Sequence, residues 1–438
     1  MSLFRKISSD IKNHLLSNDR ILLINGARQI GKTFIIREVC REMFQNFIEI
    51  NLLDDYNSHK YFQNVKTIDD FYFQVSLIAG NKLVNKESTI IFLDEIQVYE
   101  HLLTLLKFLQ QDNRYTYIVS GSLLGVTLKK TTSIPMGSIT IKQMYQLDFE
   151  EFLLANGFNN FAIDTIRNKY KALQQLDKST HDRLMDLFKK YLIVGGLPAA
   201  VKEFVATKNM YEIRKIQDET REFYSMDCSK YDKENKLKIR RIYEMIPSAM
   251  GNKKKRIVIK DIENVSWKKS MHYIDEFDYL INSGIVNEVK AISNPKFPLI
   301  ETSSKNLLKL YFNDVGILSN VLYKNNVNAV LSDLRSINLG SLYETVVASE
   351  LKAHGHKLFY YDNRNNGEVD YLIDNYDSLQ VLPIEVKSGK DYKIHSALNK
   401  LVSNAEYNID RAIVLSNERT INQNDKIIYL PIYYVMFL

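Results

Sequence analysis

The segment GARQIGKT at residues 26–33 constrains the fold of this chain more than any other stretch. The apolar, β-rich run RILLIN precedes it at residues 20–25, and the helical pattern FIIREVCREMF follows its final Lys-Thr pair. A glycine-rich loop between a strand and a helix turns its backbone N–H groups inward, toward an anion at the helix N-terminus. The segment therefore predicts an α/β domain that binds phosphate at the carboxyl edge of a parallel sheet.

The polar side chains of this G-x-x-x-x-G-K-[ST] pattern have separate expected tasks. Lys32 reaches the β- and γ-phosphates of a nucleotide, and the Thr33 hydroxyl binds Mg²⁺. We therefore expect ATP and Mg²⁺ as cofactors. The predicted nucleotide-binding residues are Gly26, Arg28, Gly31, Lys32, Thr33, Ser120 and Ser122.

Two further predicted strands end in polar residues that belong to the same site. The strand TIIFL at residues 89–93 runs into Asp94 and Glu95, and a strand at residues 115–119 runs into Ser120-Gly121-Ser122. Because ligands collect at the carboxyl ends of parallel strands, these side chains should converge on the glycine-rich loop. Asp94 is expected to hold Mg²⁺, and Glu95 to polarise the attacking water. The two serines are expected to sense the γ-phosphate, with an ordinary Ser/Gly turn as the alternative.

Length and composition limit the number and the class of the domains. The 438 residues exceed what one hydrophobic core supports, so two or three domains are expected. With 45% hydrophobic and 25% charged residues, the chain is not globally disordered. The two cysteines, Cys40 and Cys228, are too few and too far apart for a disulfide framework or a cysteine zinc site. No signal peptide or membrane-spanning apolar run is recognisable, so a cytoplasmic protein is predicted.

Positive charge is concentrated in the middle of the chain. Residues 233–269 contain 12 Lys or Arg residues against four Asp or Glu, whereas the whole chain carries a formal net charge of +6. Helical patterns in this stretch, followed by the strand-like IVNEVKAI, predict a winged helix that meets double-stranded DNA. A solvated helical face or a purely structural winged helix is the alternative. The candidate DNA contacts are Lys253, Lys254, Lys255, Arg256, Trp267, Lys268 and Lys269.

A group of carboxylates is predicted in the C-terminal third of the chain. Glu344 lies on a predicted amphipathic helix, and two strands at residues 368–373 and 381–387 form a predicted hairpin. Because side chains alternate along a strand, Glu385 and Lys387 point to one face, where the hairpin partner brings Asp370 beside them. Carboxylate oxygens suit Mg²⁺ or Mn²⁺. The alternative is a salt-bridged Glu and Lys without catalysis.

With GARQIGKT, FLDEIQ, SGSLLG and YLIVGGLPAAV in this order, the chain resembles a large prokaryotic family of AAA-type ATPases related to the archaeal and STAND NTPases. The resemblance extends over nearly the whole length. It implies that the element Gly195-Gly196-Leu197-Pro198 couples a lid to the nucleotide state; a helix C-cap followed by a proline is the alternative.

The same resemblance shows one departure, near the end of the predicted core. Many relatives carry an arginine after the glycine that corresponds to Gly137, whereas this chain has Ser138. If that arginine stabilises transition-state charge, this chain needs another cation, with Arg28 and Lys142 as candidates, and hydrolysis is expected to be slow.

The family's C-terminal domain resembles the restriction-endonuclease-like superfamily, whose D…(D/E)xK arrangement matches Asp370, Glu385 and Lys387. The resemblance implies that Asp370 and Glu385 bind Mg²⁺, that Glu344 completes the shell, and that Lys387 orients or deprotonates a water. Metal-assisted phosphodiester hydrolysis is the implied chemistry.

We therefore predict an α/β protein of three parts. An AAA-like ATPase core and lid occupies residues 1–205, a winged-helix segment residues 206–300, and a nuclease-like α/β domain residues 301–438. The leading hypothesis is a DNA-associated ATPase with a nuclease-like module. The alternative is a nucleotide-gated, STAND-like signalling protein whose C-terminal domain binds a partner, either another protein or a second copy of the chain, without cleavage.

Overall fold

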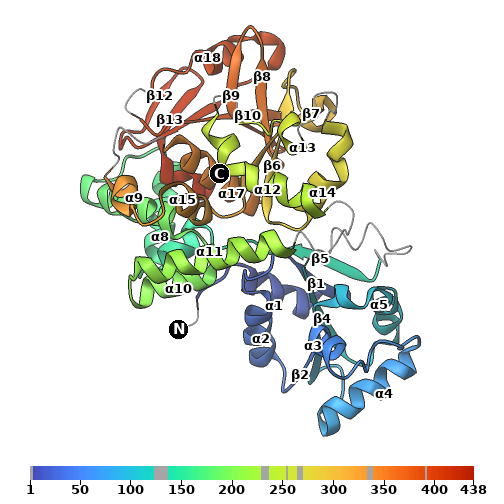
Figure 1. Cartoon of the computed structure of the whole chain (residues 1–438). Coiled ribbons are helices and arrows are strands. Elements are labelled where there is room, and N and C mark those ends of the chain that lie inside the picture. The colour runs from blue at the N-terminus through green and yellow to red at the C-terminus, as the bar shows by residue number, and fades with distance from the viewer. Residues whose placement is uncertain are drawn as a thin grey trace. The chain divides into compact units, whose positions relative to one another are not determined.

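The computed structural model describes residues 3–122, 137–227, 236–252, 255–263, 270–332, 339–389 and 392–438 (Figure 1). It divides into two compact units, here called the N-terminal and C-terminal units. The first contains the described residues of Ser2–Tyr145 with Asn282–Gly284, and the second those of Gln146–Ile281 and Ile285–Leu438. This division in two does not test the predicted boundary at residue 205, which stays a prediction.

The N-terminal unit is built on a five-stranded sheet in which all paired strands are parallel. Their order across the sheet is β2 (Asn46–Asn51), β3 (Thr89–Asp94), β4 (Thr116–Gly121), β1 (Ile21–Asn25) and β5 (Ile139–Gln143). All-parallel sheets need cover on both faces, and the near-continuous burial of β1, β3 and β4 reflects this. The predicted parallel α/β core is confirmed.

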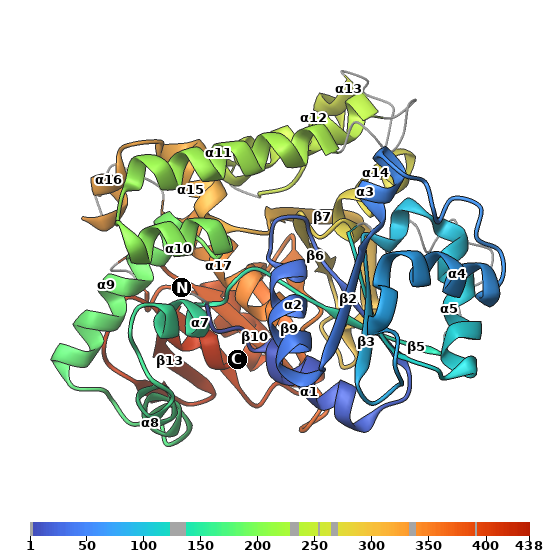
Figure 2. The same ribbon diagram turned by 90° about the horizontal axis from the view of Figure 1, so that it is seen from below.

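Helices cover both faces of this sheet (Figure 2). On one face lie α1 (Ile7–Ser17) and α2 (Lys32–Met43), and on the other α4 (Ile68–Ala79) and α5 (Glu100–Asp112), with the short α3 (Leu52–Asn57) after β2. On the α4 and α5 face, the helix residues Phe71 and Leu106 belong to one apolar cluster with alternate strand residues. These strand residues include Leu23, Ile91 and Leu93. Cys40 is buried in α2, while Cys228 lies outside the described residues.

The C-terminal unit contains an eight-stranded mixed sheet. Its order is β12 (Asn422–Asn424), β13 (Ile427–Pro431), β11 (Ala412–Ser416), β10 (Gln380–Val386), β9 (Gly367–Asn375), β8 (Phe359–Asn363), β6 (Val286–Ile292) and β7 (Ser303–Phe312). The predicted hairpin of residues 368–373 and 381–387 is confirmed as the antiparallel pair β9 and β10. Its turn is stabilised by the Asn375 side chain, which accepts hydrogen bonds from the backbone N–H groups of Asp377 and Ser378.

The strand-like segment IVNEVKAI of the predicted winged helix is β6, and it belongs to the eight-stranded sheet. Strands β6 and β7 pair in antiparallel fashion, and β6 also pairs in parallel with β8, so the hairpin forms one edge of the eight-stranded sheet. The predicted boundary at residue 300 therefore falls between two paired strands. The physical reason is that alternating apolar residues indicate a strand but not the distant strand with which it pairs.

Helices pack around this larger sheet. The described α-helices of the unit are α7 (Phe149–Ala155), α8 (Asn160–Lys171), α9 (Lys178–Val194), α10 (Pro198–Ala206), α11 (Met210–Asp227), α12 (Lys236–Gly251), α13 (Lys260–Glu263), α14 (Ile274–Asn282), α15 (Val315–Tyr323), α16 (Val327–Leu331), α17 (Gly340–Ala353) and α18 (Ser396–Ser403). Helix α18 packs on β9 in one apolar cluster, while α17 contacts β6, β7 and β10. Within the described residues, no helix is both long enough and apolar enough to cross a membrane.

Candidate nucleotide site and C-terminal acidic cluster

The loop between β1 and α2 depends on two glycines. A Cβ atom on Gly26 would lie 2.5 Å from the backbone oxygen of Met144, so no side chain fits there. Gly31 has a φ of 91°, in the left-handed region that favours glycine, and α2 begins at the next residue. The loop thus lies at the N-terminus of α2, as the strand–loop–helix pattern predicts.

Lys32 is buried in this loop, with only 5% of its surface exposed. Its Nζ atom donates hydrogen bonds to the backbone oxygens of Gly26, at 3.0 Å, and Ala27, at 2.8 Å. Burial lowers the pKa of Lys32 to about 8, against the opposing effect of Glu95 and Asp94. The ammonium group is therefore already positioned at the loop, where phosphate oxygens would be stronger acceptors than carbonyls.

Asp94 brings three separate elements together. It ends β3, and its carboxylate accepts a hydrogen bond from Thr33 Oγ1 at 2.9 Å and another from the Ser120 hydroxyl at the end of β4. Burial raises the pKa of Asp94, and the neighbouring Glu95 adds to that rise. The structure thus joins the predicted Thr33, Asp94 and Ser120, and their oxygens fit a Mg²⁺ ion.

Glu95 has a φ of 59°, a left-handed conformation that is uncommon for residues other than glycine. Its Oε2 atom accepts hydrogen bonds from the Ser122 hydroxyl, at 2.9 Å, and from the Gln97 side-chain amide. Arg28 Nε donates to Ser122 Oγ at 3.1 Å, so Arg28, Glu95 and Ser122 belong to one network. Backbone strain of this kind clusters at functional sites.

Gln97 and Arg5 contact this site although no role was predicted for either residue. Gln97 donates to Ser122 Oγ at 3.0 Å and accepts from the Ser122 N–H at 3.2 Å, which fixes Ser122 in place. The buried Arg5 guanidinium donates to the backbone oxygens of Ile30, at 3.0 Å, and Tyr145, at 2.6 Å. The signal for Gln97 was its place two residues after Glu95, whereas no local pattern marks Arg5.

The two candidate replacement cations have different surroundings. Arg28 lies in the network just described, whereas Lys142 on β5 forms an ion pair with Asp10 of α1 at 3.2 Å. Ser138 accepts a hydrogen bond from the Ile21 N–H through its backbone oxygen and lies immediately before β5. Arg28 is thus the better placed of the two.

Family models match three parts of the chain. Residues 18–153 match the model described as AAA domain. These residues are an AAA-type P-loop ATPase domain. Residues 185–328 match a domain of unknown function (DUF8612), and residues 339–435 match another (DUF4143). A search of curated proteins gives no match.

Three solved structures are similar to parts of this chain at low sequence identity. The Walker-type ATPase PABY2304 of Pyrococcus abyssi is 12% identical over 76% of this chain and 96% of its own, with a TM-score of 0.45. The Aeropyrum pernix ORC1 protein in complex with DNA is 12% identical over 76% and 95%, with a TM-score of 0.31. Thermotoga maritima RuvB, a Holliday junction branch migration motor, is 13% identical over 65% and 89%, also at 0.31.

The Gly195–Pro198 element lies in the C-terminal unit, outside the residues that match the ATPase domain. Gly195 ends α9 with a φ of 71°, and Pro198 is the first residue of α10. The Gly196 N–H donates to Asp314 Oδ2 at 2.6 Å, and Asp314 also caps α15. Burial raises the pKa of Asp314 to about 6. The helix C-cap is thus present, and a role in nucleotide coupling stays a prediction.

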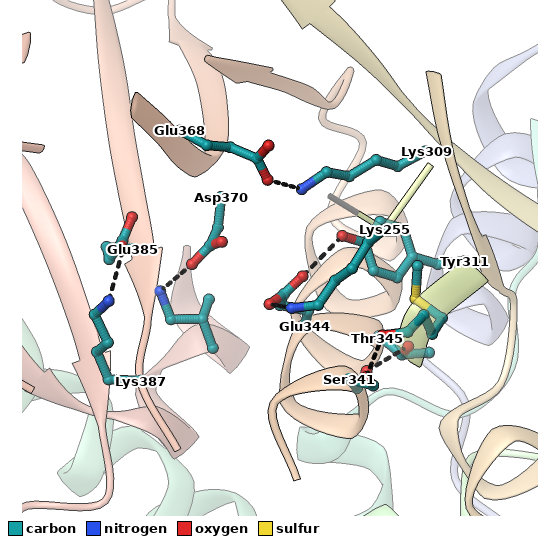
Figure 3. A network of polar contacts seen from close by, with 12 residues as sticks. Lys255, Lys309, Tyr311, Ser341, Glu344, Thr345, Glu368, Asp370, Glu385 and Lys387 are labelled. Atoms are coloured by element: carbon teal, nitrogen blue, oxygen red, sulfur yellow. Dashed lines mark hydrogen bonds and ion pairs between the residues drawn. The ribbon is translucent and has the colours of Figure 1, made fainter. Parts of the chain in front are cut away.

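Four carboxylates, Glu344, Glu368, Asp370 and Glu385, form what we call the acidic cluster (Figure 3). Lys387 Nζ forms an ion pair with Glu385 Oε1 at 2.8 Å, and Asp370 Oδ2 accepts a hydrogen bond from the Val386 N–H at 2.8 Å. Burial, together with the negative charges of Glu385 and Glu344, raises the pKa of Asp370 well above its usual range. The predicted proximity of Asp370, Glu385 and Lys387 is confirmed.

The predicted metal shell is not assembled, however. Across the described residues, no group of three or more His, Cys, Asp or Glu side chains is arranged to hold a metal ion. Glu344 is engaged by Lys255, which forms an ion pair with Oε1, and by the Tyr311 hydroxyl, which donates to Oε2 at 3.0 Å. The cluster in this arrangement therefore does not fit a metal, because protein cations and donors occupy the carboxylates.

The candidate DNA contacts are only partly described. Lys253, Lys254, Trp267, Lys268 and Lys269 lie outside the described residues. Lys255 and Arg256 are described, and both are paired with carboxylates, with 18% and 15% of their side chains exposed. These two side chains therefore face the acidic cluster instead of a solvent-exposed basic surface. The sequence showed the charge run but not its distant partners.

Proposed function

We propose that the ATPase domain binds ATP with Mg²⁺ and hydrolyses it. The observation that carries the proposal is the hydrogen bonding of Thr33 and Ser120 to Asp94, next to the buried Lys32. Thr33 and Asp94 would hold Mg²⁺, which neutralises charge on the β- and γ-phosphates. Lys32 binds and orients those phosphates at the loop.

Glu95 is proposed to polarise the attacking water. Its carboxylate is held by Ser122 and Gln97, so its position depends on two hydrogen bonds and on a strained backbone. Arg28 donates a hydrogen bond to Ser122, and it is proposed to supply the positive charge near the γ-phosphate. This cation would replace the arginine that many relatives carry at the position of Ser138. A base held in this way polarises water without further rearrangement.

Phosphate release by the purified full-length chain tests the ATPase proposal. With ATP and Mg²⁺ we expect slow release, and chelation of Mg²⁺ with EDTA should return the release to the level without enzyme, because the phosphate charge is then not neutralised. Retention of labelled ATP after gel filtration should accompany it. If the chain retains ATP but releases no phosphate, the proposal of hydrolysis is wrong. If it shows neither retention nor release, the assignment of the whole nucleotide site is wrong.

For the C-terminal unit we propose two functions that experiment can separate. The first is association with double-stranded DNA and metal-dependent phosphodiester cleavage, supported by the proximity of Asp370, Glu385 and Lys387. The second is nucleotide-gated binding of a partner, a protein or a second copy of the chain, without cleavage. The engagement of Glu344 by Lys255 supports the second.

Cleavage of supercoiled plasmid with Mg²⁺ or Mn²⁺ distinguishes these two functions. If the unit cleaves DNA, the combined change of Asp370→Ala and Lys387→Ala should lower the cleavage rate at least ~100-fold, because a metal ligand and the water-orienting amine are both removed. The control is Asp377→Ala, in the exposed turn after β9. Equal lack of cleavage in the wild type and both variants would exclude the first function.

A further inference from the structure

Helix α4 of the N-terminal unit is apolar on two sides, and its own unit covers one of them. Of its 12 residues, all but two Asp, one Gln and one Ser are apolar or aromatic. Phe71, Val75 and Ala79 follow one another at intervals of four residues and are buried in the core beneath the helix. The helix lies beside α5 on one face of the five-stranded sheet (Figure 2). This buried stripe attaches α4 to its unit.

A second apolar stripe of α4 faces outward. Phe73 lies two residues after Phe71, which turns its side chain about 200° round the helix. Leu77 comes one turn later on the same side, and 59% of Phe73 and 60% of Leu77 are exposed. Ile78, next to Leu77, is 44% exposed. A helix that is apolar all round is normally covered all round, so this stripe indicates a surface that another molecule covers.

The charged residues at the two ends of this stripe determine which molecule fits it. Asp69 lies one turn before Phe73, at the N-terminal end of α4, and Lys82 lies just after the C-terminal end, in the short turn Gly80–Lys82. Both side chains are exposed, and neither forms an ion pair with another residue that the structure describes. With opposite charges at its opposite ends, the stripe is complementary to a reversed copy of itself.

We propose that the exposed stripe of α4 binds the same stripe of a second copy of the chain, in an antiparallel arrangement with two-fold symmetry. Phe73 of each copy packs near Leu77 of the other, which covers the apolar centre of both stripes. Asp69 of each copy meets Lys82 of the other at the rim. The small side chain of Ser76, beside Leu77, lets the two helices approach closely. This inference does not depend on the function proposed for either unit.

A lipid surface fits the stripe less well than a second copy does. Helices that lie in a membrane interface carry Lys or Arg on their polar side, whereas α4 contains two Asp residues and neither basic residue. A single pair of short helices makes an interface at the small end of the range, about 1,200 Å² or less. The dimer is therefore expected to be weak and concentration-dependent, with a dissociation constant on the order of micromolar.

Sedimentation equilibrium of the full-length chain without nucleotide, over concentrations that span the micromolar region, tests the proposal. Wild type should pass from monomer to dimer. Leu77→Asp places a charge at the centre of the apolar contact and should weaken dimerisation roughly 30-fold or more. The matched control is Leu16→Asp, because Leu16 on α1 is also an exposed leucine of this unit, at 77%, and lies outside the stripe. Its dimerisation should equal that of wild type.

Charge reversal tests the antiparallel arrangement. Asp69→Lys and Lys82→Asp should each weaken the dimer about threefold or more, because like charges then meet at the rim. Both changes in one chain should restore the wild-type dissociation constant. About 15 Å of helix separates Asp69 from Ala79, so Asp69 and Lys82 lie at opposite ends of α4 in any one chain. Restoration would therefore come from contacts between copies.

Thermal unfolding and vesicle binding of the same variants separate the remaining outcomes. A wild type that stays monomeric at the highest concentration would overturn the proposal, and so would a dimer that Leu77→Asp does not weaken. If wild type is monomeric and Leu77→Asp lowers its unfolding temperature, the chain covers the stripe by itself. Binding to phosphatidylcholine vesicles that Leu77→Asp abolishes would assign the stripe to a lipid surface instead. A dimer that the double charge reversal does not restore would overturn the antiparallel arrangement.

Discussion

Replacing Lys32 with alanine is expected to abolish ATP binding. The change removes a buried ammonium group that the loop carbonyls of Gly26 and Ala27 hold in place. Truncating one partner of a buried, hydrogen-bonded charge pair costs about 2–5 kcal/mol, so ATP affinity should fall roughly 30- to 4,000-fold. Titration of a fluorescent ATP analogue by anisotropy, with Mg²⁺ present, measures the effect.

The matched control for this variant is Lys12→Ala. Lys12 lies on α1 of the same unit, where it pairs with Glu42 on the surface at 2.7 Å, and its loss should leave ATP affinity unchanged. If the Lys32→Ala protein is folded by circular dichroism and still binds ATP within about threefold of wild type, the assignment of the loop as the triphosphate site is wrong.

Glu95→Gln is expected to bind ATP but not to hydrolyse it. The amide keeps the shape of the side chain and an oxygen that can still accept from Ser122, while it loses the negative charge that polarises water. General base catalysis contributes about 100- to 10,000-fold, so turnover should fall by that factor at nearly unchanged ATP affinity. Single-turnover hydrolysis and anisotropy on the same preparation give both quantities.

A suitable control for this second variant is Glu100→Gln. Glu100 is an exposed residue in the first turn of α5, and its carboxylate is not part of the Glu95 network, so turnover should match wild type. Retained turnover in Glu95→Gln would assign the water-polarising role to another group. In that case Asp94 would be the next residue to test, because it lies beside Glu95 at the end of β3.

The nucleotide site was largely predictable from the sequence. The loop glycines, Lys32, Thr33 and Asp94 all occupy the positions that their pattern predicts, because the curl of a glycine-rich loop and the end of a buried strand are local backbone properties. Gln97 and Arg5 were not predictable in the same way. Their contacts depend on side chains that reach across from separate elements.

In the C-terminal unit, less of the arrangement was predictable from the sequence. The β9–β10 hairpin and the pairing of Glu385 with Lys387 follow from side-chain alternation over a few residues. The place of β6 beside β8, by contrast, could not be inferred, because the alternation of one strand does not specify its neighbour in a sheet. For the same reason the sequence did not predict that β6 and β7 form one edge of the larger sheet.

The sequence by itself determined where Gly26, Gly31, Lys32 and Thr33 lie, since their spacing along one strand–loop–helix unit leaves little freedom. Only the tertiary structure decided which cation each carboxylate of the acidic cluster meets. Lys255 and Glu344 are 89 residues apart in the chain, yet they form an ion pair. Coulomb attraction depends on distance in space and on burial, and neither quantity can be read from a run of basic residues.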